Sequence, residues 1–228
     1  MAALLLADLR LQWRQGFYAA YALVCVSYAL VLGALPDELR RWLVPLIVYS
    51  DPAVLGFFFV GGLTLLERGE GVLQPLFVTP VRVEAWLASK CISLTALALS
   101  VVAALGVLGE TNRWGLLMSA AALTSVCFVL LGVIAVSRFE TINQYIGGAV
   151  LWATPLVAPV LPMVAGWSPG WMLAWPTCAS LALFQGAFAE APMPWGTAAV
   201  CLLSLAAWTG LAWVWAVRWF SRYTLGLR

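Results

Sequence analysis

Long runs of apolar residues constrain this chain more than any other feature of its sequence. A helix needs about 20 apolar residues to cross a hydrocarbon layer roughly 30 Å thick. The chain is 64% hydrophobic and 10% charged, so it lacks the charged quarter with which soluble domains cover their cores. We therefore predict an all-α, polytopic membrane protein with a single transmembrane domain over residues 1–228. The six predicted spans are Phe17–Leu35, Val44–Leu66, Cys91–Gly109, Gly115–Val136, Tyr145–Ala165 and Gly196–Val217.

The positions of the positive charges predict the orientation of these spans. With six spans and a cytoplasmic N-terminus, nine of the 12 Lys and Arg residues lie on the cytoplasmic side. A seventh span over Trp171–Ala189 would leave six on each side. Because cytoplasmic loops are enriched in Lys and Arg, we predict six spans with both termini in the cytoplasm. Residues 166–195 are then an outer re-entrant or lid segment between the fifth and sixth spans.

The first 15 residues predict a short amphipathic helix. Such a helix is too short to span a membrane, so we expect residues 1–15 to lie flat in the cytoplasmic interface, with membrane lipid as their partner. Its apolar face consists of Ala2, Leu5, Leu6, Leu9 and Trp13, while Asp8, Arg10, Gln12 and Arg14 lie largely on the other sides.

The cytoplasmic loop at residues 67–84 is the longest inner segment whose composition is not explained by contact with the hydrocarbon layer. The second span ends in the charged pair Glu67-Arg68, and Gly69 and Gly71 follow it. A short element with an apolar face comes next and stops at Thr79-Pro80. Such an element cannot bury its own apolar residues, so it needs a groove in a partner or the headgroup layer. Its apolar residues are Val72, Leu73, Leu76 and Phe77.

This loop resembles the loop between the second and third spans of type-2 ABC exporter permeases, which has the form E-R-E-x-G-T-L-x-x-L-x-V-T-P followed by Lys. The segment Ser50–Phe57 resembles the fluoroquinolone or multidrug export subset of that family. Pro75 departs from the pattern, because the family usually has a helix former there. The residues that match in kind, with small shifts of spacing, are Glu67, Arg68, Glu70, Gly71, Leu73, Leu76, Val78, Thr79, Pro80 and Lys90.

The resemblance implies that residues 1–15 are a connecting helix and that the 67–84 loop holds a coupling helix which docks on a cytosolic ABC ATPase subunit. It implies export of a lipophilic or amphipathic substrate, drug-like or lipid-like, across a plasma membrane, the inner membrane in bacteria. The implied coupling residues are Glu67, Arg68, Glu70, Gly71, Leu73, Leu76, Phe77, Thr79 and Pro80.

An exporter of this kind needs ATP, yet the sequence contains no G-x-x-x-x-G-K-[ST] loop, and its single lysine, Lys90, follows Ala88-Ser89. We expect no catalytic residue and no cofactor on this chain, with ATP and Mg²⁺ bound by a separate ATPase subunit. Six spans make half a pore, so we also expect a second permease copy or a paralogue. A net charge of +2 argues against a nucleic-acid partner, and the absence of His, with five scattered Cys, argues against a metal site.

Competing functions are open at this point. A haem-export permease of cytochrome c maturation has a similar length, although the absence of His leaves no usual axial ligand. An ion-coupled secondary transporter needs ionisable residues deep in the membrane, and only Asp51 qualifies. An intramembrane hydrolase fits poorly, because no nucleophile and base share a helical face.

Four further residues have two readings each. Asp51 is either a pathway carboxylate or a cap for a helix that starts at Pro52, and we favour the cap. Lys90 could at most form a catalytic Ser-Lys pair with Ser89, but adjacent residues on a helix point apart, so we favour a side chain that snorkels to the inner headgroups. Arg138 and Glu140 lie in the second inner loop, which either contacts the ATPase or is a solvated turn.

Overall fold

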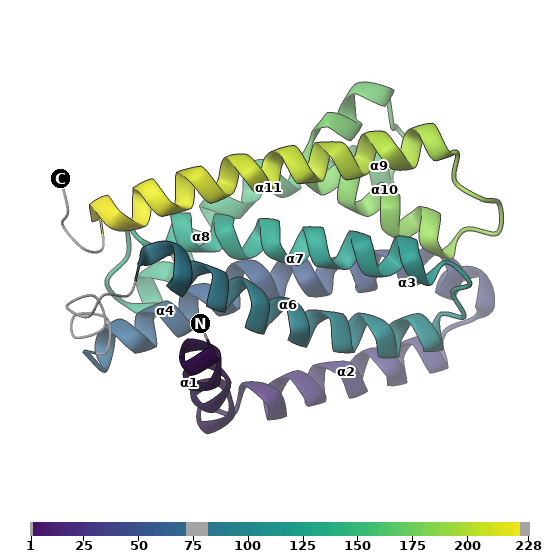
Figure 1. Cartoon of the computed structure of the whole chain (residues 1–228). Helices are drawn as coiled ribbons and strands as arrows, with labels where there is room; N and C mark the ends of the chain where they lie inside the picture. Colours follow the sequence, from purple (N-terminus) through teal and green to yellow (C-terminus); the bar gives the residue numbers. More distant parts are fainter. Residues whose placement is uncertain (1, 72–81, 224–228) are drawn as a thin grey trace.

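The computed structural model describes residues 2–71 and 82–223, and the regular structure in these residues is helical (Figure 1). The long helices run roughly side by side, and both ends of the described chain lie at the same end of the bundle. The elements are α1 (Ala2–Arg14), α2 (Phe17–Ala34), α3 (Asp37–Val54), the π-helix η1 (Leu55–Phe59), α4 (Val60–Gly69), α6 (Val83–Leu108), α7 (Trp114–Val136), α8 (Ile142–Val157), α9 (Val160–Val164), the 3-10 helix η2 (Gly170–Ala174), α10 (Pro176–Phe188) and α11 (Trp195–Tyr223).

Four helices in the described residues are long and apolar enough to cross a membrane: Glu38–Gly69, Val83–Leu108, Trp114–Val136 and Trp195–Phe220. A shorter apolar helix covers Tyr21–Ala34. The prediction of an all-α, multi-pass membrane protein is therefore confirmed. The count of six spans and their orientation stay predictions.

The predicted span Tyr145–Ala165 is not one regular helix. Helix α8 ends at Val157 and α9 starts at Val160, with Pro155 inside the first and Pro159 between the two. Proline lacks the amide donor of the helical ladder and its ring clashes with the preceding turn, which explains the break.

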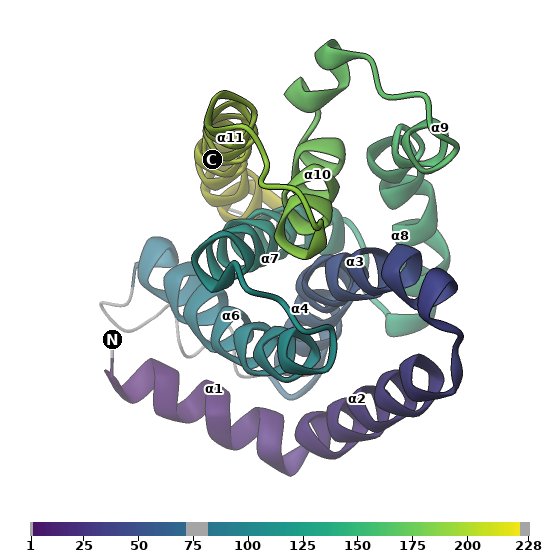
Figure 2. The ribbon, with the colours of Figure 1, turned by 90° about the vertical axis from the view of Figure 1, so that its right-hand side faces the viewer.

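Helix α7 forms the centre of the bundle. It is apolar on all sides. Of its most apolar 18-residue stretch, 78% is buried, whereas only 22% of the corresponding stretch of α11 is buried. In the end-on view, α3, α6, α10 and α11 surround α7 (Figure 2). A helix that is apolar on all sides is found in a protein core or in lipid. Helix α7 lies in the core of the bundle, whereas most of the apolar stretch of α11 is exposed.

The second predicted span is continuous but irregular. Helices α3, η1 and α4 follow one another without a break, and α3 contains Pro45 and Pro52. The π-helical turn begins at Leu55, three residues after Pro52. Helix α7 approaches this turn closely at Gly132, where a Cβ atom would collide with the carbonyl oxygen of Phe57. Only glycine permits such close backbone contact.

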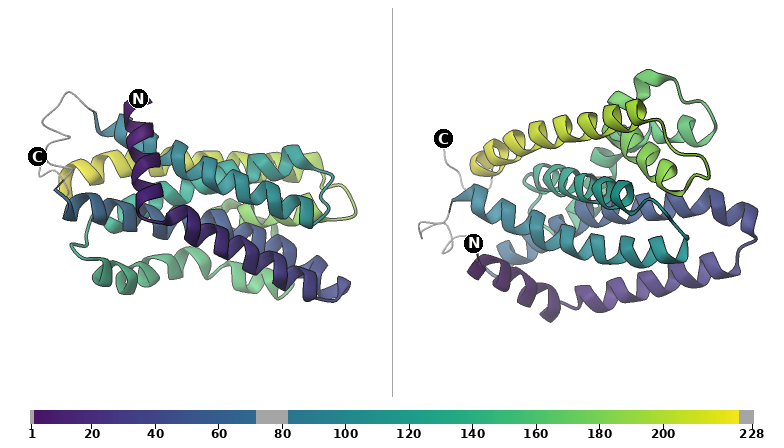
Figure 3. Two further views of the ribbon diagram at one scale, coloured as in Figure 1. Left: turned by 90° about the horizontal axis from the view of Figure 1, so that it is seen from below. Right: turned by 45° about the vertical axis from the view of Figure 1, so that its right-hand side comes forward.

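Helix α1 runs across the direction of the long helices (Figure 3) and has the reverse polarity of a surface helix in water. Leu6, Leu9 and Trp13 are 56%, 40% and 75% exposed, whereas Asp8 and Gln12 are buried against α6. Lipid over the apolar face would favour this arrangement. The helix matches the predicted amphipathic segment, and its place in the interface stays a prediction.

The segment at 166–195 contains η2 and α10. Helix α10 has 13 residues, too few to span a membrane. Its first turn lies inside the bundle, because the indole N–H of Trp175 and the hydroxyl of Thr177 donate to the carbonyl of Leu156, at 3.0 and 2.7 Å. Its other end lies near the α6–α7 connection, where the Thr111 hydroxyl donates to the carbonyl of Ala187. Trp171–Ala189 is therefore not one spanning helix.

Candidate functional site

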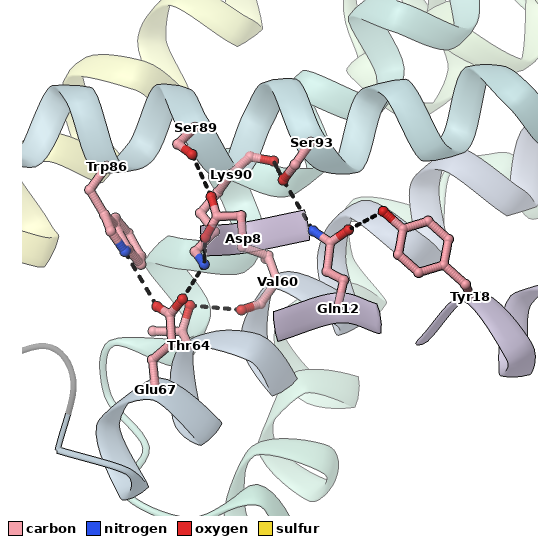
Figure 4. Close-up of polar contacts among 10 residues, drawn as sticks. All are labelled: Asp8, Gln12, Tyr18, Val60, Thr64, Glu67, Trp86, Ser89, Lys90 and Ser93. Atoms are coloured by element: carbon pink, nitrogen blue, oxygen red, sulfur yellow. Dashed lines mark hydrogen bonds and ion pairs between the residues drawn. The ribbon is translucent and has the colours of Figure 1, made fainter. Parts of the chain in front are cut away.

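The side chain of Lys90 is fully buried in α6. An isolated buried ammonium group would be very unfavourable, so it needs acceptors within reach. Its Nζ atom donates to Asp8 Oδ1 of α1 at 2.5 Å and to Glu67 of α4 (Figure 4). Both carboxylates are also buried. We call Asp8, Glu67 and Lys90 the inner charge cluster; it joins α1, α4 and α6.

Neutral donors from the first turns of α6 complete the coordination of the two carboxylates. The hydroxyl of Ser89 donates to Asp8, and the indole N–H of Trp86 donates to Glu67 Oε2 at 3.3 Å. The ammonium group also lies 5.6 Å from the centre of the Trp86 ring, a distance typical of cation–π contact. Each charge in the cluster therefore has a partner of suitable chemistry.

Polar contacts extend the cluster along α1. The Gln12 side chain donates to Ser93 of α6 at 3.1 Å and accepts from the hydroxyl of Tyr18 of α2 at 3.2 Å. Figure 4 shows this row beside the charges. Toward the solvent, Arg14 forms an ion pair with Glu70 at 3.1 Å. Because α1 contacts α2, α4 and α6 through directional bonds, its position relative to them is fixed.

Lys90 does not snorkel to the headgroups, so the reading that we favoured was wrong. Hydropathy locates Lys90 at the inner end of a span, but it gives no sign that two carboxylates face it. The sequence likewise places Asp8 away from the apolar side of α1, with no sign of the helix that it contacts. One signal was present in the sequence: Asp8 interrupts the apolar stretch Ala2–Leu9.

The loop residues predicted from the motif divide into two groups. Glu67 lies in the inner charge cluster, Glu70 pairs with Arg14, and Gly71 has a positive φ of 67°, which explains the glycine after α4. The Arg68 guanidinium donates to the carbonyl of Phe139 at 2.8 Å. The others lie outside the described residues: Leu73, Leu76, Phe77, Thr79 and Pro80.

The second inner loop is tied to the bundle. The guanidinium of Arg138 lies 5.5 Å from the ring centre of Trp152 in α8 and 4.8 Å from that of Trp219 in α11. Arg68, Arg138 and the exposed Glu140 line a shallow cavity of about 450 Å³. The two inner loops therefore meet at the same end of the bundle.

Asp51 does not cap a helix, which overturns the reading that we favoured. It lies inside α3, which starts at Asp37, and its side chain is only 3% exposed. The hydroxyl of Tyr21 in α2 donates to its carboxylate. Pro52 lies within the helix rather than starting it, and a π-helical turn begins three residues later.

The cluster offers no metal site, because the ammonium of Lys90 already occupies the space between the two carboxylates. No group of three or more His, Cys, Asp or Glu side chains in the described ranges 2–71 and 82–223 is placed to hold a metal ion.

The sequence profile of the fluoroquinolones export permease protein family matches residues 1–227. The chain belongs to this family. It is also 28% identical over 192 residues to the fluoroquinolones export permease proteins of Mycobacterium tuberculosis strains CDC 1551 / Oshkosh and ATCC 25618 / H37Rv. The alignment covers 82% of this chain and 81% of each relative. Membership of the family makes the chain a transporter rather than an enzyme and confirms the narrower resemblance read at Ser50–Phe57.

Proposed function

We propose that the chain is the transmembrane permease subunit of an ATP-driven type-2 ABC exporter that moves a lipophilic or amphipathic drug out of the cytoplasm. Membership of the fluoroquinolones export permease family supports the drug as cargo. The motif at 67–84 supports a coupling helix that docks on a cytosolic ABC ATPase subunit. That subunit binds ATP and Mg²⁺, because this chain carries no phosphate-binding loop.

The inner charge cluster carries this proposal. Glu67 and Lys90 lie on opposite sides of the loop and pair with each other, and Lys90 also pairs with Asp8 of α1. Removing one partner of a buried ion pair costs about 3–5 kcal/mol. A displacement of the loop by an ATPase would therefore move the ends of α4 and α6 together with α1, instead of pulling them apart.

The contact between the inner loops supplies a second mechanical path. The bond from Arg68 to the carbonyl of Phe139 joins α4 to the second inner loop. Arg138, from the same loop, contacts tryptophans of α8 and α11. Movement at the end of α4 would thus reach the C-terminal half of the chain.

The assembly that we propose contains two permeases, identical or paralogous, and two ATPase subunits in a plasma membrane. Each permease crosses six times with both termini in the cytoplasm, and residues 166–195 re-enter from outside. The short α10, whose first turn lies against Leu156, supports the re-entrant arrangement.

Co-purification and ATP dependence test this function. The tagged chain is expressed with a candidate cytosolic ABC ATPase subunit, reconstituted in nanodiscs, and assayed for fluoroquinolone-stimulated ATP hydrolysis; export is measured in inverted vesicles. We expect a stable complex and export that requires ATP. Active, ATP-independent export by the chain alone would contradict the proposal and favour an ion-coupled transporter.

The loop itself has a direct test. Phe77→Asp places a charge on the apolar face that we predict to dock on the ATPase, so we expect drug-stimulated ATP hydrolysis to be lost while membrane insertion is retained. Glu38→Gln, an exposed change in the first turn of α3 and outside the loop, is the control. Full coupled activity in Phe77→Asp would show that the loop is not the docking element.

A further inference from the structure

Asp51 lies near the middle of the longest candidate span. Glu38–Gly69 has 32 residues, and at 1.5 Å per helical residue Asp51 lies about 20 Å from its start and about 27 Å from its end. Ionisable side chains at such depth are costly and are usually retained for a function. The carboxylate therefore lies at a depth where burying a charge is costly.

The compensation of this carboxylate is incomplete. The hydroxyl of Tyr21 is the hydrogen-bond donor that the described residues supply, and no Lys or Arg among them forms an ion pair with Asp51. A hydroxyl neutralises no charge. A carboxylate buried without a cation is strongly destabilising, so a cationic ligand would be held firmly there.

The backbone around Asp51 is also irregular. Pro52 removes one amide donor from the helical ladder, and the π-helix Leu55–Phe59 begins three residues later. π-Helical turns are rare and occur frequently at functional sites. They leave backbone groups less regularly bonded and let a helix change its local geometry at low cost.

The surroundings of the carboxylate are aromatic and lie near an open face. The ring of Tyr21 contacts that of Phe59 edge to face, with centres 6.1 Å apart. Along α3, Val54, one turn after Asp51, is 50% exposed, and Ile47, one turn before it, is only partly buried. Helix α2, which carries Tyr21, lies at the edge of the bundle (Figures 1 and 2). The face of α3 that carries Asp51 is therefore open at Val54, one turn along the helix.

We propose that Asp51, with the rings of Tyr21 and Phe59, binds the protonated amine of an amphipathic substrate. The carboxylate pairs with the ammonium group, and the aromatic rings add cation–π attraction. The apolar part of the substrate lies along the exposed residues of α3. This inference rests on the proposed drug export, and it names the feature of the drug that the permease recognises.

Two matched ligands test it: a fluoroquinolone with a piperazine amine, and its analogue in which an uncharged morpholine replaces the piperazine. Their binding to the purified chain in nanodiscs is measured by ligand fluorescence, without ATPase or ATP. We expect Asp51→Asn to weaken binding of the amine by on the order of 30-fold and to leave binding of the morpholine analogue unchanged. Glu38→Gln, the same change at an exposed site on α3, should alter neither.

The outcomes separate the two proposals. If Asp51→Asn weakens both ligands equally, or neither, Asp51 does not recognise the amine, while drug export stands. If the wild-type chain binds neither ligand, both proposals fail. Tyr21→Phe keeps the ring and the charge, so we expect it to weaken the amine less than Asp51→Asn does; a larger loss in Tyr21→Phe would instead mean that the pair only holds α2 against α3.

Discussion

Two buried carboxylate sites in this chain differ in how their charge is compensated. In the inner charge cluster, Asp8 and Glu67 share the ammonium of Lys90 and receive further bonds from Ser89 and Trp86. Asp51 has a tyrosine hydroxyl and, in the described part of the chain, no cation. The complete set of partners suits a rigid joint, whereas the incomplete set suits a place where a ligand supplies the missing charge.

The largest effect is expected from Lys90→Met. It leaves two buried carboxylates side by side without a cation, and we expect a loss of about 3–5 kcal/mol in unfolding free energy. Thermal unfolding of the purified protein in nanodiscs measures this, and coupled ATP hydrolysis should fall with it. Lys90→Arg keeps the charge and is the control. An unchanged melting temperature in Lys90→Met would contradict the contrast between the two sites, because it would mean that the cluster does not stabilise the packing of α1, α4 and α6.

The cluster can be removed entirely to separate stability from coupling. The combination of Lys90→Met, Asp8→Asn and Glu67→Gln leaves no charge in the cluster, and buried ion pairs are often replaceable without loss of stability. We expect the triple variant to recover most of the melting temperature that Lys90→Met loses, while coupled ATP hydrolysis stays low. Recovery of both would reduce the cluster to a purely structural role.

At the second site, Tyr21→Phe removes the donor and leaves the charge. Hydrogen bonds to charged groups contribute about 1.5–3 kcal/mol, so we expect a loss in this range, smaller than that of Lys90→Met. The same thermal unfolding experiment measures it. A loss as large as that of Lys90→Met would show that the two sites do not differ in the way described.

Asp51→Asn is expected to change stability by less than about 1 kcal/mol. The amide oxygen still accepts from Tyr21, and the unpaired charge is gone, so the loss of a charge-assisted bond is offset by easier burial. Thermal unfolding at neutral pH checks this. A destabilisation of several kcal/mol would place Asp51 in the same class as the inner charge cluster.

The smallest effect is expected from Arg14→Gln. Arg14 and Glu70 form an ion pair near the cluster, but their side chains are 71% and 36% exposed. Exposed pairs contribute about 0–1 kcal/mol, and less at high salt. We expect a change within about 0.5 kcal/mol, measured at low and at high salt. A larger change would mean that the α1–α4 contact depends on this pair more than on the buried charges.

The sequence predicted the membrane class well, because the energy of placing a segment in lipid depends mainly on its own length and composition. The structure places long apolar helices over Val44–Leu66, Cys91–Gly109, Gly115–Val136 and Gly196–Val217. Prediction was weaker at 145–165 and 171–189. There, proline and packing against other helices, rather than hydropathy, determine where each helix ends.

The candidate sites were predictable only as single residues. Glu67 and Asp51 were noticeable because each is a charge in or beside an apolar run. The roles of the charged residues were not predictable. The favoured readings of Asp51 as a cap and of Lys90 as a snorkelling side chain considered only residues near them in the sequence. Asp8 and Lys90 are 82 positions apart, and no local pattern shows that α1 packs against α6.

By itself, therefore, the sequence determined that this chain is helical, that it belongs in a membrane, and which inner loop is unusual, since these follow from local composition and spacing. Only the tertiary structure decided which charges are compensated. A buried charge is stable or unstable according to what other helices place beside it, and that depends on how helices distant in the sequence pack. The same packing made Lys90 a joint between three helices and left Asp51, among the residues that the structure describes, with a tyrosine hydroxyl as its partner.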